Sequence, residues 1–279
     1  MAITLHNRLF RGFVRSKVAL ALPVTFLILL VSTLGIITVT YYFSVERLNT
    51  QSETLKVSTA KQNFLSLDDV ILSTLWQPGS SATFDLTDSG GLTNIQPTSN
   101  VLTISINDNS SIEETIFNSS VGKVTYELPY SGSSETGLYL KGDSRTITNQ
   151  SGSSLSQLCI ANGVQHPEIQ LRYRPTVSYA TGGLENGKAV TEIRIYIVNL
   201  NSSDPIALQG ELPLKISCTS TQLTTKTYEV SYQPENLAIT STLDSANGSV
   251  SVPISNTPEG AIINIETVIS NISIERWIR

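Results

Sequence analysis

The sequence predicts a mainly β protein with one long N-terminal α-helix, in which a transmembrane helix continues into a stalk and is followed by an antiparallel Ig-like β-sandwich. Three observations predict this fold: an uncharged segment near the N-terminus, helically spaced apolar residues after it, and alternating apolar and polar residues over the rest of the chain. The predicted parts are a basic cytoplasmic arm (1–17), a transmembrane helix (18–45), an extracytoplasmic helical stalk (46–76), a linker (77–81) and a β-sandwich domain (82–279).

The segment from Val18 to Val45 carries no charged residue. A helix of this length exceeds the roughly 30 Å hydrocarbon core of a bilayer, and it is too long for a cleaved signal sequence or an ordinary buried core helix. The charges after it are mixed in sign, whereas those before it are all cations: Arg8, Arg11, Arg15 and Lys17. By the positive-inside rule the N-terminus lies in the cytoplasm and the C-terminal domain is extracellular, with Tyr41, Tyr42 and Phe43 as an aromatic belt at the outer interface.

The helical pattern continues beyond the apolar segment. Val45, Leu48, Leu55, Gln62 and Leu65 recur at close to the helical repeat, so we expect helix to about residue 75, with a break near residue 66. This apolar stripe is thin and predicts packing on the chain's own β domain or on a neighbouring copy. The Pro-Gly-Ser-Ser sequence after Gln77 then ends the helix.

From residue 82 the apolar residues alternate with polar ones, which is typical of strands that are buried on one face. The segments that alternate are 101–106, 123–128, 168–173, 191–198, 211–217, 226–232 and 262–274. Asn186-Gly187 and Asn247-Gly248 are predicted two-residue hairpin turns, because both residues of a type I′ turn need positive φ. The Ser- and Gly-rich segments 131–136 and 149–156 are predicted surface loops, and a single sandwich is favoured over two tandem domains.

Composition limits the function. Outside the basic arm, 14 Lys and Arg stand against 23 Asp and Glu, so nothing suggests binding to nucleic acid. Cys159 and Cys218 are the only cysteines, and outside the cell they form either one disulfide or two unpaired buried thiols; both alternatives stay open. Six Asn-x-Ser/Thr sequons are present, of which Asn271 is the least suited to glycosylation because it lies inside a strand pattern. The five candidate glycosylation sites are Asn109, Asn118, Asn149, Asn201 and Asn247.

No enzyme motif is found, so the sequence predicts a non-enzymatic protein with no catalytic, cofactor-binding or metal site. His166, the only histidine after the arm, is expected in a loop, and Asp68 and Asp69 on a solvated helix face. Asp108, between Asn107 and Asn109, is expected to form a turn rather than a calcium site. Arg172 and Arg174 share one strand face, which we expect to meet solvent rather than an anion, and Trp76 and Trp277 are expected to anchor the stalk to the β domain.

The basic arm, the outward-continuing helix and the C-terminal sandwich together resemble archaeal members of the type IV filament superfamily: pilins, archaellins and pilin-like membrane proteins. The entry sequence from Ala19 to Val24, Ala-Leu-Ala-Leu-Pro-Val, is similar to the Ser-Pro-Val-Ile entry of archaeal pilin helices. In that family a dedicated peptidase cuts just before the apolar segment, and the resemblance implies Ala19 as the processing site.

The resemblance implies a structural function. Helices released from the bilayer would bury their apolar surface against each other in a filament core, with membrane lipid, other pilin-like subunits or the chain's own copies as partners. The residues expected in this role are Leu20, Leu22, Val24, Phe26, Leu27, Leu29, Leu30, Leu34, Ile36 and Ile37. The alternative is a permanently anchored surface adhesin or receptor whose sandwich loops bind an extracellular glycan or protein.

Overall fold

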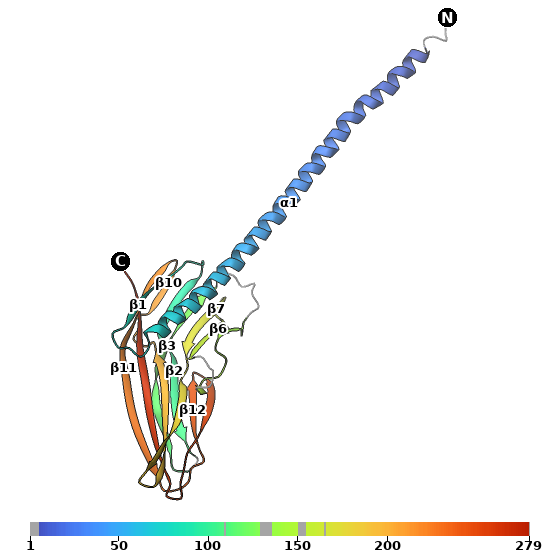
Figure 1. Cartoon of the computed structure of the whole chain (residues 1–279). Helices are drawn as coiled ribbons and strands as arrows, with labels where there is room; N and C mark the ends of the chain where they lie inside the picture. Colours follow the sequence, from blue (N-terminus) through green and yellow to red (C-terminus); the bar gives the residue numbers. More distant parts are fainter. Residues whose placement is uncertain (1–5, 109, 129–135, 150–154, 165, 279) are drawn as a thin grey trace. The chain divides into compact units, whose positions relative to one another are not determined.

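The computed structural model describes residues 6–108, 110–128, 136–149, 155–164 and 166–278, with side chains described from Pro23 onward. The chain divides into two compact units, Met1–Leu55 and Lys56–Arg279. A single helix, α1 (His6–Thr74), precedes a domain made mostly of β-strands (Figure 1). The predicted fold class, one long N-terminal helix followed by a β-sandwich, is confirmed.

Helix α1 is unbroken at residue 66, where a break was predicted, and ends at Thr74, close to the predicted end near residue 75. Its last turn is closed by Ser80, whose hydroxyl donates a hydrogen bond to the Thr74 carbonyl at 2.8 Å. Trp76 has a φ of 66°, in the left-handed region that commonly terminates helices. The chain therefore reverses at Trp76 and enters the first strand at Ser81.

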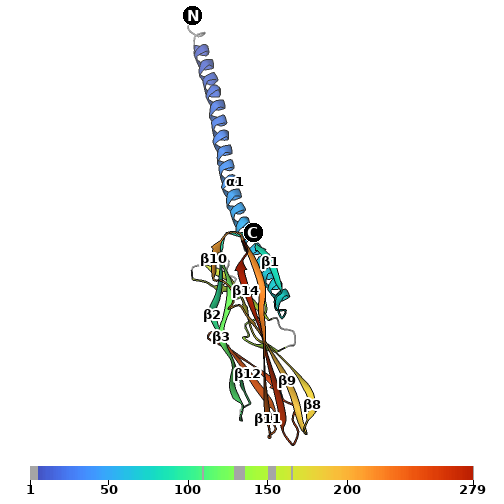
Figure 2. The ribbon, with the colours of Figure 1, turned by 90° about the vertical axis from the view of Figure 1, so that its left-hand side faces the viewer.

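The first sheet has six strands in the order β1-β11-β14-β9-β8-β5. Figure 2 shows β8, β9, β11 and β14 as long neighbouring strands. Two pairs, β9 with β14 and β5 with β8, are parallel, so this sheet is mixed rather than purely antiparallel. The strands are β1 (Ser81–Leu86), β5 (Thr148–Asn149), β8 (Thr176–Glu185), β9 (Lys188–Asn199), β11 (Leu212–Val230) and β14 (Ala261–Arg276).

The second sheet has eight strands, seven in the order β13-β12-β2-β3-β7-β6-β4, with β10 paired to β2. All its described pairs are antiparallel. The strands are β2 (Leu92–Asn107), β3 (Glu113–Glu127), β4 (Tyr139–Lys141), β6 (Ser156–Asn162), β7 (Pro167–Tyr173), β10 (Ile206–Gln209), β12 (Asn236–Leu243) and β13 (Ala246–Pro253).

The predicted strands are found, but two of them are parts of one longer strand, and one of the two predicted hairpin turns is misplaced. The segments 211–217 and 226–232 belong to one strand, β11, whose polar middle hides the alternation in the sequence. Asn186 and Gly187 form the predicted hairpin turn, with φ values of 50° and 82°. The second predicted turn is wrong: Asp244 (φ 57°) and Ser245 turn the chain, and Asn247-Gly248 lies inside β13 opposite β12. The predicted loops 131–136 and 149–156 lie mostly outside the described residues.

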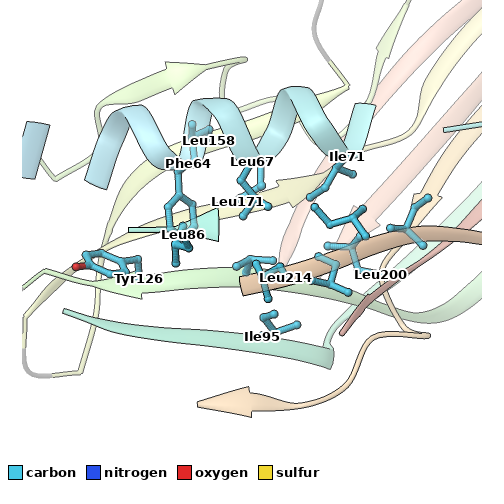
Figure 3. Close-up of a cluster of buried hydrophobic side chains, with 14 of the residues drawn as sticks. Phe64, Leu67, Ile71, Leu86, Ile95, Tyr126, Leu158, Leu171, Leu200 and Leu214 are labelled. Carbon is cyan, nitrogen blue, oxygen red and sulfur yellow. The ribbon is translucent and has the colours of Figure 1, made fainter. Parts of the chain in front are cut away.

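The core between the sheets holds two apolar clusters, and the end of α1 belongs to the first. Its buried face carries Ala60, Phe64, Leu67 and Ile71, which recur every three or four residues as one helix face requires, and the buried Leu75 follows directly after the helix. Figure 3 shows Phe64, Leu67 and Ile71 pointing at leucines of several strands. The end of α1 is therefore part of the β domain's own core. Of the two packing partners predicted for the stalk, the chain's own β domain and a neighbouring copy, this part of the helix contacts the β domain.

Candidate functional site

Helix α1 is apolar on all sides between Pro23 and Val45. Phe26, Leu27, Ile28 and Leu29 are consecutive, so they point in directions about 100° apart around the helix. Each keeps more than half of its surface exposed, from 58% for Ile28 to 69% for Phe26. A helix that is hydrophobic all round needs an apolar environment. By length and composition α1 can cross a membrane, so it suits a membrane span or a signal anchor.

Four hydroxyl side chains of this segment form hydrogen bonds within their own helix. Ser32, Thr33 and Thr38 donate their hydroxyls to the carbonyls four residues earlier, at 2.7, 2.7 and 2.8 Å. Ser44 does the same to the carbonyl of Thr40 at 2.7 Å. A hydroxyl that is bonded within its own helix can enter hydrocarbon without losing a partner. These four hydroxyls therefore do not oppose an apolar environment.

The predicted assembly residues with described side chains are all exposed: Val24, Phe26, Leu27, Leu29, Leu30, Leu34, Ile36 and Ile37. Leu20, Leu22 and Ala19 lie in helix, but their side chains are outside the described set. Tyr41, Tyr42 and Phe43, the predicted aromatic belt, are 64–70% exposed. From Val24 to Phe43 the segment thus presents an uncharged and mostly apolar surface.

A buried carboxylate attaches the end of α1 to the β domain. The Asp68 side chain is 0% exposed, and it accepts hydrogen bonds from the hydroxyls of Ser156 (2.7 and 2.8 Å) and Tyr173 (2.8 Å). The ammonium group of Lys141 lies 2.6 Å from Asp68 and 2.9 Å from Asp69. The predicted solvated face is therefore wrong for Asp68 and correct for Asp69, whose side chain is 72% exposed.

The Asp68 cluster, defined as Asp68, Lys141, Ser156 and Tyr173, shifts the pKa values of Tyr173 and Lys141. Burial raises the pKa of the Tyr173 phenol well above 10, and the Asp68 carboxylate raises it further, so Tyr173 remains a donor. Burial lowers the pKa of Lys141, but its hydrogen bonds to both aspartates outweigh that effect and the net pKa is raised. The cluster is therefore an ion pair between Asp68 and Lys141 to which two hydroxyls donate.

The predicted solvent-facing arginine pair is wrong for Arg174. Its guanidinium is 0% exposed and donates to the carbonyl of Arg145 at 2.9 Å and to the Asp143 carboxylate. Arg172 lies on the outer face of β7 and donates to the Gln157 amide oxygen at 2.8 Å. Both arginines contact the chain itself, so they do not form an anion-binding patch.

Acid is expected to weaken the ion pair between Asp143 and Arg174. Hydrogen bonds from Arg145 and Arg174 hold the pKa of the Asp143 carboxyl well below its usual value. Because the folded pKa lies below the unfolded one of about 3.9, the contribution to stability is complete above about pH 4 and is lost as the pH falls through the folded pKa. Thermal unfolding of the chain in detergent between pH 7 and 3 should show the native protein's advantage over Asp143→Asn shrinking below about pH 4. A constant difference across that range would contradict this assignment.

The Asp108 turn is present. One carboxylate oxygen of Asp108 accepts hydrogen bonds from the backbone N–H groups of Ser110, Ser111 and Ile112, at 2.9–3.0 Å, and the other accepts from the Tyr232 hydroxyl. Its oxygens thus close the turn between β2 and β3. Asn109 lies outside the described residues. Among the residues that the structure describes, no three His, Cys, Asp or Glu side chains gather as metal ligands.

The two cysteines are free thiols, so the disulfide alternative is not realised. Cys159 pairs with Gln170, whose neighbours Ile169 and Leu171 face the core, so Cys159 lies on the outer face of the eight-stranded sheet. Cys218 belongs to the core cluster and comes from the six-stranded sheet. The Cys159 side chain therefore points away from the core, whereas the Cys218 side chain lies in it. Burial raises the pKa of the Cys159 thiol, which makes it less reactive.

The described sequons differ in accessibility. Asn118, Asn201 and Asn247 are exposed and Asn149 is half-buried. Asn271 is 9% exposed and donates from its amide to the Ser220 hydroxyl at 3.0 Å. Glycosylation at the first four remains a prediction, whereas the geometry of Asn271 disfavours it.

The two tryptophans have different surroundings. Trp76 packs against the first core cluster and meets Tyr196 edge to face, with ring centroids 5.3 Å apart, as expected of an anchor. Trp277 is 38% exposed and lines an open pocket of about 340 Å³ with Leu86, Leu212, Pro213 and two carboxylates, Asp85 and Glu211. His166 lies in the connection between β6 and β7 as predicted.

The buried position of Asp68 had a signal in the sequence. Asp68 lies four residues after Phe64 and three before Ile71, on the apolar face of the helix. Its partners Lys141, Ser156 and Tyr173 are distant in sequence and carry no comparable signal.

Comparison of the chain with protein-family models, curated proteins and solved structures finds no match.

Proposed function

We propose that this chain is a non-enzymatic cell-surface protein, anchored in the membrane by α1 with its N-terminus in the cytoplasm, that serves as a subunit or accessory of a pilin-like, type IV-like filament. The observation that carries the proposal is the surface of α1 from Val24 to Phe43, which is apolar all round and has internally bonded hydroxyls. Such a surface can be buried by lipid or by other apolar helices.

The same helix supports a structural function because its end is built into the β domain. Phe64, Leu67 and Ile71 are 0% exposed in the core, and Asp68 adds the ion pair with Lys141. The last turns of α1 are therefore held to the β domain by a packed interface. In the proposed filament the apolar part of the helix would hold the assembly together and the β domain would form its surface.

The experiment compares the chain in membranes with the chain in material sheared from cells, using intact mass and N-terminal sequencing. We expect the sheared fraction to contain a product that begins at or near Ala19, without the basic arm. An intact N-terminus in a chain found only in membranes would contradict the filament function.

That second outcome would favour the other candidate, a permanently anchored adhesin. It is supported by the pocket at Trp277, where a half-exposed indole lies beside Asp85 and Glu211. An aromatic face flanked by carboxylates suits a sugar ring or a cationic side chain. The ligand would then be an extracellular glycan or protein.

A further inference from the structure

The exposed surface of α1 contains a regular seven-residue repeat. Written as heptads abcdefg, the a and d positions together form what we call the heptad seam. The a positions are Val24, Val31, Thr38, Val45 and Ser52, and the d positions are Leu27, Leu34, Tyr41, Leu48 and Leu55. All ten side chains are exposed, from 37% for Val45 to 70% for Tyr41 among the large apolar ones. The seam spans five heptads of one continuous helix.

The decisive part of the seam lies beyond the apolar segment. Between residues 44 and 56 the only apolar side chains are Val45, Leu48 and Leu55, and all three fall on the seam. The three charged residues in the same stretch, Glu46, Arg47 and Glu53, fall at b and c positions, away from it. Contact with lipid does not require the apolar residues to stay at a and d positions where the helix becomes polar. Packing against a partner helix does require it, because the a and d positions form the contact.

The residue types identify the partner. Four of the five a positions are β-branched and four of the five d positions are leucine, the exceptions being Ser52 and Tyr41. β-Branched residues at a with leucine at d favour a parallel, two-stranded coiled coil. Copies of one chain that enter a membrane in the same direction are necessarily parallel, so the a and d positions of one copy meet those of the other. A strict seven-residue spacing also matches the left-handed crossing that is common between membrane helices. The occupant that fits the seam is therefore a second copy of α1.

The seam stops where the helix acquires another partner. Ala60, five residues after Leu55, is 2% exposed in the β domain's core, and Phe64 follows at 0%. The next d position, residue 62, is a glutamine. One part of α1 thus offers its stripe to another helix, and the following part uses its stripe within its own domain.

We propose that the chain forms a parallel homodimer through the heptad seam of α1, from Val24 to Leu55. The dimer rests on the membrane anchoring in the proposed function but not on filament formation, and it would hold for a permanently anchored protein as well. In this dimer the a and d residues of the seam face the partner helix, and the other exposed apolar residues of α1 face lipid or further subunits.

The test is disulfide cross-linking of single-cysteine substitutions in native membranes. Leu48→Cys, Ser52→Cys and Leu55→Cys place a thiol on the seam, and Thr50→Cys and Thr54→Cys place one off it on the same helix. Ser52, Thr50 and Thr54 are all small, exposed hydroxyl residues, so these three variants form a matched set. The native chain is the background control, because Cys159 and Cys218 are buried.

We expect mild oxidation to give a dimer band severalfold stronger at the three seam positions than at Thr50 and Thr54. Equal cross-linking at all five positions, or none at the seam, in chain that is recovered with membranes would overturn the dimer and leave the proposed function standing. If the native chain is not recovered with membranes at all, both proposals fail.

Discussion

Replacing Leu30 and Leu34 together by arginine is expected to prevent α1 from residing in a membrane. Both lie near the middle of the apolar segment, with 48% and 55% of their surface exposed. Each exchange of leucine for arginine at a helix centre costs about 3–4 kcal/mol on insertion scales, so the pair costs about 6–8 kcal/mol. Cell fractionation followed by alkaline carbonate extraction should find the native chain in the membrane pellet and the double variant in the supernatant.

The matched control places two arginines at the same spacing outside the apolar segment. Thr50→Arg with Thr54→Arg adds the same charge to the same helix at exposed positions. This variant should stay in the carbonate-resistant pellet. Retention of the Leu30 and Leu34 double variant in that pellet would show that the apolar segment is not what holds the chain in a membrane.

Lys141→Met is expected to give the largest loss of β-domain stability among single polar substitutions. It leaves the Asp68 carboxylate, 0% exposed, without the ammonium group now 2.6 Å away. Removing one partner of a buried pair costs about 3–5 kcal/mol, and the lower end applies because Lys141 is 27% exposed. For a domain of this size about 3 kcal/mol corresponds to a fall in Tm of roughly 6–12 °C, measurable by thermal unfolding of the full chain in detergent.

Two variants separate the buried pair from a general effect of lost charge. Asp69→Asn removes the other carboxylate near Lys141, but that side chain is 72% exposed, so the change should stay within about 1 kcal/mol. Adding Asp68→Asn to Lys141→Met removes the uncompensated charge and should restore much of the lost stability. If Lys141→Met unfolds at the same temperature as the native chain, the cluster does not stabilise the attachment of α1.

The elements of this fold that depend on local pattern could be predicted from the sequence. The uncharged segment after Lys17, the period-two strands and the Asn186-Gly187 turn each express a property of adjacent residues. The prediction of the second turn, at Asn247-Gly248, was wrong because it also relied on adjacent residues alone. Asn247-Gly248 has the preferred dipeptide, but the pairing of β12 with β13 places the reversal at Asp244, which also tolerates positive φ.

The polar interior depends on contacts that a sequence pattern does not contain. Arg174 follows a strand whose alternation predicts an exposed side chain, yet its guanidinium is buried because Asp143 and the Arg145 carbonyl lie opposite it. Cys159 and Cys218 are separated because their strands belong to different sheets, which the spacing of two cysteines does not reveal. The heptad seam was readable in principle, but the abundance of leucine between residues 20 and 37 conceals its phase until residues 45–55.

The most direct test of the account is whether the β domain of the membrane-anchored chain lies outside the cell. Ser245→Cys places a thiol at an exposed turn, while the native Cys159 and Cys218 are buried and serve as the unlabelled background. A membrane-impermeant maleimide should label the Ser245→Cys chain on intact cells to the same extent as on permeabilised ones, and should leave the native chain unlabelled. Labelling only after permeabilisation would place the β domain inside the cell and contradict a cell-surface function.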